Sequence, residues 1–175
     1  MSCTLSTGIA SVDCMDGVGG LLEVRLTEKA NISGITKTGS SVTAVTMESG
    51  TQFYTFAIDQ EKAFATSVMT KNIANGTTPW VHTLQSTWRK LSITKTNLIK
   101  ILAQNTGLVA IVTDNNGNYL MLGYNLGGHI TTVTGATGTG IGDANGYDWT
   151  FTANDKEDWY YVSSGVIAAL DSPAS

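Results

Sequence analysis

Few residues of this 175-residue chain are suited to acid–base or nucleophilic chemistry, and none stands in a recognisable catalytic arrangement. The two histidines, His82 and His129, both lie in segments with strand-like sequence and not in a known motif. Nucleophilic catalysis needs a nucleophile beside a base, and glycoside hydrolysis needs two carboxylates at a set separation. The sequence therefore predicts that the protein has no catalytic residue and is not an enzyme, and that both histidines are packed or solvated polar residues.

Three short segments resemble ligand-binding loops only in part. Residues 138–142 (GTGIG) resemble a phosphate-binding loop, but a strand-like segment follows where a dinucleotide site needs a helix. Residues 114–118 (DNNGN) begin like a calcium loop, whose twelfth position must be a carboxylate; here it is Asn125. Residues 143–146 (DANG) also offer too few ligands. We interpret these segments as a flexible connection and tight turns, and we expect no cofactor and no metal ion.

Two cysteines and a group of aromatic residues are the remaining candidate ligands. Cys3 and Cys14 lack the two further ligands of a zinc site, and the sequence leaves open whether they pair or remain free thiols. The aromatic side chains could stack on a sugar, although burial in a core or an interface is the commoner use of such residues. They are Trp80, Trp88, Trp149, Trp159, Tyr160 and Tyr161.

The composition is typical of a mostly β protein with a weakly charged surface. Charged residues make up 14% of the chain, against about 25% in an average protein, and much of its polarity comes from Thr, Ser, Asn and Gly. Thr favours strands, whereas Gly and Asn favour turns. The net charge of −4 and the lack of a basic run argue against a nucleic-acid binder that tracks phosphates. We expect one domain, residues 1–175, with no membrane span and no secretory signal.

Alternation of apolar and polar residues predicts strands along most of the chain. The expected strands cover 21–27, two segments within 32–48, 52–58, 108–113, 119–124, 129–134 and, as the last strand, 147–151. One helix is expected, Lys95–Gln104, with Thr94 or Thr96 as its N-cap. Residues 1–20 are expected to form an irregular N-terminal arm, and residues 163–175 a C-terminal tail. The predicted fold is a β-sandwich or partly closed barrel with one flanking helix.

Residues 59–91 predict a long β-hairpin with its turn at Asn75-Gly76. Each arm has about ten residues, and neither face is a continuous apolar stripe. We expect the hairpin to have two unpaired edges that a neighbouring subunit covers, because free edges of this length promote aggregation. The residues expected to serve assembly or to line a channel are Phe64, Thr66, Val68, Lys71, Asn75, Gly76, Val81, Thr83, Gln85, Thr87 and Arg89.

Which face of the hairpin would line a channel stays open at this point. One face is expected to be wet, and the other, with Phe64, Val68, Leu84 and Trp88, to meet the sandwich or its neighbours. Deletion of the hairpin from Val68 to Leu84 is expected to leave a folded monomer that cannot polymerise.

The order of these elements resembles the tail-tube family of tailed bacteriophages, and most closely the tube-like structural proteins of phages that infect Bacteroidetes. The likeness is carried by residues 13–20 (DCMDGVGG), 98–103 (LIKILA), 113–124 (TDNNGNYLMLGY) and 142–147 (GDANGY). The resemblance implies a β-sandwich with a flanking helix and hexameric rings that stack into a tube, whose inner barrel takes a long hairpin from each subunit. It further implies a place in the virion tail after synthesis in the host cytoplasm, other tail proteins as partners, and passage of DNA without specific binding.

Other functions remain open at the level of sequence. Tail-completion and head-decoration proteins share similar folds, a non-catalytic module for a sugar or a surface protein is a further alternative, and an enzyme with an unusual site is the last. Many tail tubes present a negative channel, whereas this hairpin carries Lys71, Arg89 and Lys90. Rings or tubes of the purified protein in negative-stain micrographs would favour the tube, and a monomer that binds glycans would favour the module.

Overall fold

The computed structural model describes residues 8–9, 17–59 and 61–174, and the structural account is confined to them. Most of the expected N-terminal arm, including Cys3 and Cys14, lies outside the described residues, so the state of the two thiols stays a prediction.

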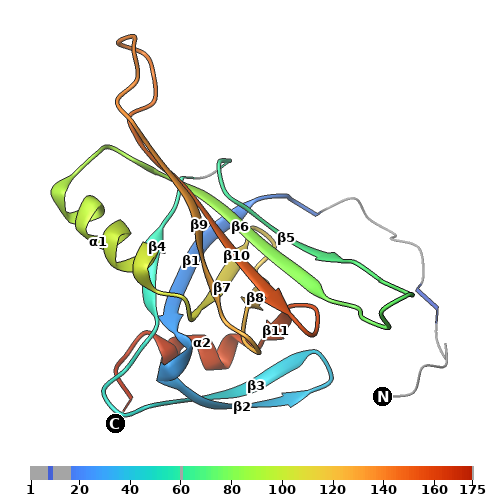
Figure 1. Ribbon diagram of the computed structural model, residues 1–175. Coiled ribbons are helices and arrows are strands. Elements are labelled where there is room, and N and C mark those ends of the chain that lie inside the picture. Colours follow the sequence, from blue (N-terminus) through green and yellow to red (C-terminus); the bar gives the residue numbers. More distant parts are fainter. Residues whose placement is uncertain (1–7, 10–16, 60, 175) are drawn as a thin grey trace.

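The described chain is mostly β, as predicted, and forms one open sheet of eleven strands with two α-helices. Along the sheet the strands follow the order β2-β3-β11-β8-β7-β9-β10-β6-β5, and β1 joins at β7 and carries β4 (Figure 1). The elements are β1 Leu21–Glu28, a 3-10 turn Lys29–Asn31, β2 Ile32–Thr38, β3 Ser41–Met47, β4 Tyr54–Ala57, β5 Phe64–Met69, β6 Trp80–Arg89, α1 Ile93–Gln104, β7 Leu108–Asp114, β8 Tyr119–Leu122, β9 Gly128–Ala136, β10 Gly146–Asp155, β11 Tyr160–Val162 and α2 Ser164–Leu170.

Strand β7 lies at the centre of the molecule and is buried on both faces. Its unbroken apolar run is typical of such a strand, because a strand with one face in water alternates instead. Leu108, Ala110 and Val112 belong to one apolar core, and Val109 and Ile111 belong to a second. The first core lies between β1 and β7 on one side and β6 and β10 on the other, and the second packs against α2. The molecule is therefore built in layers around a shared central strand.

Helix α1 confirms the predicted helix and begins two residues earlier than expected, at Ile93. Its N-cap is Ser92, whose hydroxyl accepts a hydrogen bond from the backbone N–H of Lys95 at 3.2 Å. The prediction of Thr94 or Thr96 as the cap was wrong, because Thr96 instead hydrogen-bonds Tyr147 and the carbonyl of Ser92.

Two short elements near the C-terminus were missed by the sequence analysis. The expected last strand extends over Gly146–Asp155, and β11 follows it, pairing with both β8 and β3. The expected tail contains α2, which buries Ile167 and Leu170 in the second core. A strand of three residues and a helix of seven are too short to show a clear hydrophobic period.

Candidate functional site

The predicted hairpin is present and is formed by β5 and β6. The two strands pair antiparallel from Phe64 opposite Gln85 to Met69 opposite Trp80. A single bridge between Asn72 and Thr77 continues the pairing toward the tip. The first arm has six residues in its strand and the second has ten, so the first arm is shorter than expected.

The expectation that the hairpin has two unpaired edges was wrong. Strand β10 pairs with β6 along the whole of its length, from Trp80 opposite Asp155 to Arg89 opposite Gly146. Of the two hairpin strands, only β5 therefore has no partner on one side among the described residues. On the other side of β10, β9 touches β7 through just one pair, Leu108 opposite Gly128, among the described residues. The result is a four-stranded unit, β9–β10–β6–β5, in which β5 and β9 beyond Gly128 each have an edge that pairs with no described strand.

The register between β5 and β6 decides which residues share a face. Thr66 lies opposite Thr83, and Val68 lies opposite Val81. These residues point outward, whereas the alternate residues of β6 are buried: His82, Leu84, Ser86 and Trp88. The expectation that Phe64 and Val68 share a face with Leu84 and Trp88 was wrong, since Phe64 is 47% exposed and Val68 is 54% exposed. A shift of one residue in register exchanges the faces, and the long turn leaves that register unspecified in the sequence.

The outward face continues across β10 and β9 and is rich in threonine. Thr66, Thr83 and Thr152 form one row across three strands. Thr150 lies between Thr132 of β9 and Gln85 of β6 in the next row. We call this surface the threonine face, defined by Phe64, Thr66, Val68, Val81, Thr83, Gln85, Thr87, His129, Thr131, Thr132, Thr134, Asp148, Thr150, Thr152 and Asn154.

The threonine face carries little charge. Asp148 accepts a hydrogen bond from the hydroxyl of Thr87 at 2.5 Å. At the end of β6, Arg89 forms an ion pair with Asp59, which offsets its positive charge. Lys71 lies beyond the end of β5, in the exposed segment that leads to the hairpin tip. Such a face has no cluster of cations that could hold phosphates.

The structure brings most of the predicted assembly residues together. Phe64, Thr66, Val68, Val81, Thr83, Gln85 and Thr87 share the threonine face, and Arg89 closes one end of it. Lys71, Asn75 and Gly76 instead lie toward the exposed hairpin tip, away from the paired part of the strands. The sequence analysis missed the residues of β9 and β10, because nothing in the sequence indicated that β10 pairs with β6.

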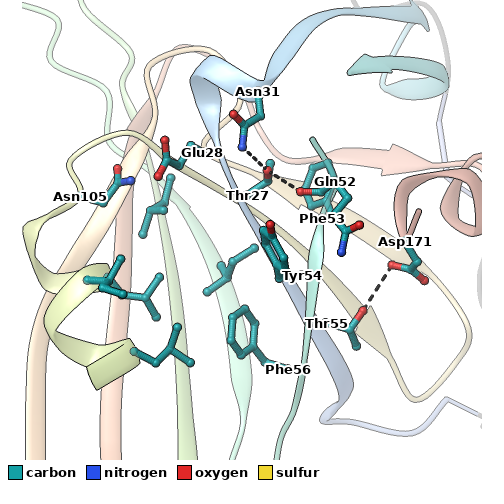
Figure 2. Close-up of a pocket in the computed structure, with 15 residues that line it drawn as sticks. Thr27, Glu28, Asn31, Gln52, Phe53, Tyr54, Thr55, Phe56, Asn105 and Asp171 are labelled. Carbon is teal, nitrogen blue, oxygen red and sulfur yellow. Dashed lines mark hydrogen bonds between the residues drawn. The ribbon is translucent and has the colours of Figure 1, made fainter. Parts of the chain in front are cut away.

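A second feature is a cleft of about 730 Å³ between α1 and β4 (Figure 2). Tyr54 and Phe56 of β4 line one wall, and Leu98, Ile101 and Leu102 of α1 line the other. The polar residues around it are Thr27, Glu28, Asn31, Gln52, Thr55, Asn105 and Asp171. The carboxylate of Asp171 accepts hydrogen bonds from Arg25 and Thr55. The cleft joins segments distant in sequence, so no local pattern could have predicted it.

The turn segments considered as ligand loops use their polar groups internally. Asp114 accepts hydrogen bonds from the backbone N–H groups of Asn116 and Asn118, at 2.9 and 2.7 Å, so the predicted hairpin turn is confirmed. Burial alone would raise the pKa of Asp114, but the hydrogen bonds from Asn118 and Asn116 outweigh it and hold that pKa below its ordinary value. The N–H groups of Thr139 and Gly140 donate to the carboxylate of Asp143.

The two histidines lie apart, one exposed and one buried, and two of the four tryptophans lie in the first core. His129 is exposed on β9, and His82 is buried beneath the threonine face. Trp88 and Trp149 pack against each other in the first core with their rings tilted by 48°, at 5.2 Å between ring centroids. Within the described ranges, no group of three or more His, Cys, Asp or Glu residues is placed to hold a metal ion.

Stability is expected to fall on acidification because His82 is buried in neutral form. Its Nδ1 accepts a hydrogen bond from the backbone N–H of Gly123 at 3.2 Å, so its proton is on Nε2. Burial lowers the pKa of His82, and Asp155 and Asp158 offset this only in part. Below the unfolded pKa of 6.5, the unfolded chain therefore binds a proton that the folded chain does not. The free energy of unfolding should decrease by up to about 1.4 kcal/mol per pH unit from pH 6.5 downward.

Urea unfolding between pH 7.5 and 5.5 measures this slope. His82→Gln should flatten it, because the substituted side chain does not titrate. An identical slope in the variant would show that other groups cause the effect.

The chain matches no protein-family model, and no curated protein or solved structure is significantly similar to it. The described helices include none that is both long enough and apolar enough to cross a membrane.

Proposed function

We propose that this chain is a virion structural protein, the subunit of a bacteriophage tail tube that assembles as stacked hexameric rings around a channel for DNA. The observation that carries the proposal is the four-stranded unit β9–β10–β6–β5, which combines two free edges with an uncovered, weakly charged face. The resemblance of the sequence to tail-tube proteins points in the same direction.

The directions of the four strands suit a head-to-tail ring. Every neighbouring pair in the unit is antiparallel, so β5 and β9 run in opposite directions. The β5 edge of one copy can therefore pair with the β9 edge of the next copy as another antiparallel pair. Head-to-tail contacts of this kind generate rings when the rotation between copies closes. A closed ring would leave no free edge in this sheet, which removes a route to aggregation.

In such a ring the threonine face would line the channel. Its threonine hydroxyls can hydrogen-bond to water. Its charged groups already have partners, since Arg89 pairs with Asp59 and Asp148 accepts a hydrogen bond from Thr87. DNA would pass without being held, because retention by phosphates requires several lysine or arginine contacts. The proposed role is thus passive conduction, and it needs no catalytic residue.

Deletion of the hairpin from Val68 to Leu84 cannot serve as the test. It would remove Leu84 and His82, which are 0% and 1% exposed, together with much of the strand that pairs with β10. Loss of this much buried material is expected to unfold the chain rather than to leave a monomer.

Disulfide cross-linking tests the proposed contact while leaving the core intact. In a chain with Cys3→Ser and Cys14→Ser, Thr66→Cys on β5 is combined with Thr132→Cys or Thr134→Cys on β9. Paired strands bring such residues within the separation that a disulfide allows. Mild oxidation should give a ladder of covalent oligomers that ends at a closed hexamer on a non-reducing gel.

The matched control is Thr66→Cys with Thr43→Cys, which places the second thiol on exposed β3, outside the four-stranded unit. It should give no ladder. Micrographs of each sample should show rings or tubes in the absence of oxidant. Rings without a ladder from either β5–β9 pair would refute the edge contact, and a monomer in all samples would refute the tube.

A further inference from the structure

The free edge of β4 runs beside an apolar cleft that no described residue fills. Strand β4 pairs with β1 on one side, from Leu26 opposite Tyr54 to Glu23 opposite Ala57, and has no described partner strand on its other side. The cleft between β4 and α1 opens along that edge (Figure 2), and a second hollow of about 370 Å³ shares Phe56 with it. An unpaired edge beside an apolar cleft is a typical place for an added strand.

The apolar residues along this cleft are unusually exposed for their size. Tyr54 is 57% exposed and Ile101 is 62% exposed, and they belong to opposite walls. An apolar side chain placed between Tyr54 and Ile101 would remove its own surface and the exposed surfaces of both residues from water. Burial of apolar surface contributes about 25 cal/mol per Å², which favours an apolar occupant.

The two ends of the cleft differ in charge. Near the Ala57 end, the ammonium group of Lys95 donates to the backbone carbonyls of Arg89 and Lys90. It has no carboxylate within ion-pair distance among the residues that the structure describes. At the other end lies the exposed carboxylate of Glu28. The cleft therefore suits a segment that carries large apolar side chains on one face and is acidic at the Lys95 end.

We propose that residues 5–12 of a second copy of this chain add to the free edge of β4 as a parallel strand, with Asp13 toward Lys95. This segment reads LSTGIASV, and in an extended strand Leu5 and Ile9 share one face. Ile9 is described and is fully exposed. Asp13 and Asp16 follow the apolar part, which matches the charge of the cleft and sets the parallel direction. Eight extended residues span about 26 Å, enough to cover β4 and the adjoining hollow.

The described residues just before β1 favour a segment from another copy. The N–H of Val18 donates to Asn116 at 2.8 Å, and Asn116 donates to the carbonyl of Val18 at 2.7 Å. Asn115 donates to the carbonyl of Gly19 at 2.7 Å. These bonds hold the chain on the β7–β8 turn, on the side of β1 away from β4. Val18 and Gly19 therefore lie on the far side of β1 from the cleft, and the inference assigns the segment to a second copy, which the proposed self-assembly would supply.

The two native cysteines flank the segment and permit a direct test in the full-length chain. Gln52→Cys places a thiol at one end of β4, and Ala57→Cys, in a separate variant, places one at the other. An equal mixture of ¹⁴N- and ¹⁵N-labelled chains is unfolded, refolded together and oxidised mildly. Mass spectrometry of the proteolysed sample identifies each disulfide and shows whether its halves come from one chain or from two. Thr43→Cys on exposed β3 is the control.

We expect Cys14 to bond with the thiol introduced at Ala57. Cys3 should not bond with the thiol introduced at Gln52, because an extended strand separates Cys3 from Cys14 by about 36 Å, whereas Gln52 lies only about 17 Å from Ala57 along β4. The bond between Cys14 and position 57 should be at least ten times more abundant than any bond to the control position, with half of its population joining ¹⁴N to ¹⁵N chains. Three results in a sample that contains rings or tubes would overturn the inference and leave the proposed function standing: a Cys14–position 57 bond within one chain only, bonding of Cys14 to position 52 in its place, or a yield equal to that of the control. A sample without any oligomer would overturn both.

Discussion

Tubes that carry Thr83→Lys together with Thr152→Lys are expected to retain DNA, whereas tubes of the unmodified chain leave it in solution. The two threonines lie directly opposite each other at the centre of the threonine face. Two added cations per subunit, repeated around a ring, would create the phosphate contacts that the face lacks. Because 6–10 such contacts lose about 10³- to 10⁵-fold in affinity between 50 and 200 mM salt, the effect should be strong and salt-dependent.

Filter retention of a fluorescent DNA duplex measures this result. At 50 mM salt we expect about 100-fold more DNA on the variant tubes than on unmodified tubes, and little on either at 200 mM. Two lysines opposite each other cost up to about 1 kcal/mol, so micrographs must confirm that the variant still assembles.

The control for this experiment places the same two charges elsewhere. Thr36→Lys with Thr43→Lys adds them to the exposed β2–β3 hairpin, outside the threonine face. If this variant retains as much DNA as the first, the threonine face is not the lining of a channel and the proposed function loses its main support.

Replacement of Gly128 by alanine is expected to lower the free energy of unfolding by about 3 kcal/mol. Gly128 begins β9, where a Cβ atom would lie 2.3 Å from Cζ of Phe151 and 2.8 Å from Cβ of Ala153. Phe151 and Ala153 are both 0% exposed, so neither side chain has room to move away. The added methyl group therefore overpacks the first core. Urea unfolding of the unassembled protein at constant pH measures the loss.

Two further variants make this test specific. Gly34→Ala on β2 should change stability by less than about 0.5 kcal/mol, because its Cβ would meet no atom within 4 Å. Phe151→Leu shortens the opposing side chain, so its combination with Gly128→Ala should cost less than the sum of the two single changes. A loss for Gly128→Ala as small as that for Gly34→Ala would contradict the described packing of β9 on β10.

Local patterns in the sequence predicted the β class, most strands, helix α1 and the turn at 114–118, because each depends on residues close together in the chain. The alternation within β6 also predicted correctly that Val81 and Leu84 lie on opposite faces. In contrast, the pairing of Phe64 with Gln85 depends on the geometry of a long turn, and a shift of one residue would have exchanged its face.

The candidate site could be predicted only in part, because half of the threonine face comes from strands far along the chain. Thr83 and Thr152 are direct neighbours across β6 and β10 although 69 positions separate them in the sequence. The pattern of each strand shows which residues alternate, but not which strand lies beside which. The cleft beside β4 had no sequence signal for the same reason, since its two walls come from β4 and α1.

The width of the four-stranded unit determines how much each subunit enlarges the channel of a ring built from it. Neighbouring strands lie about 4.8 Å apart, so each subunit adds about 19 Å to the inner circumference and about 6 Å to the diameter. The circumference of such a ring cannot change by a single strand, because each subunit contributes four strands. A ring with one subunit too many or too few would therefore present a mismatched rim to the ring above it and could not continue the column. The number of subunits in a ring would therefore determine the diameter of the channel. Only a ring with the same number of subunits could dock on the ring below it.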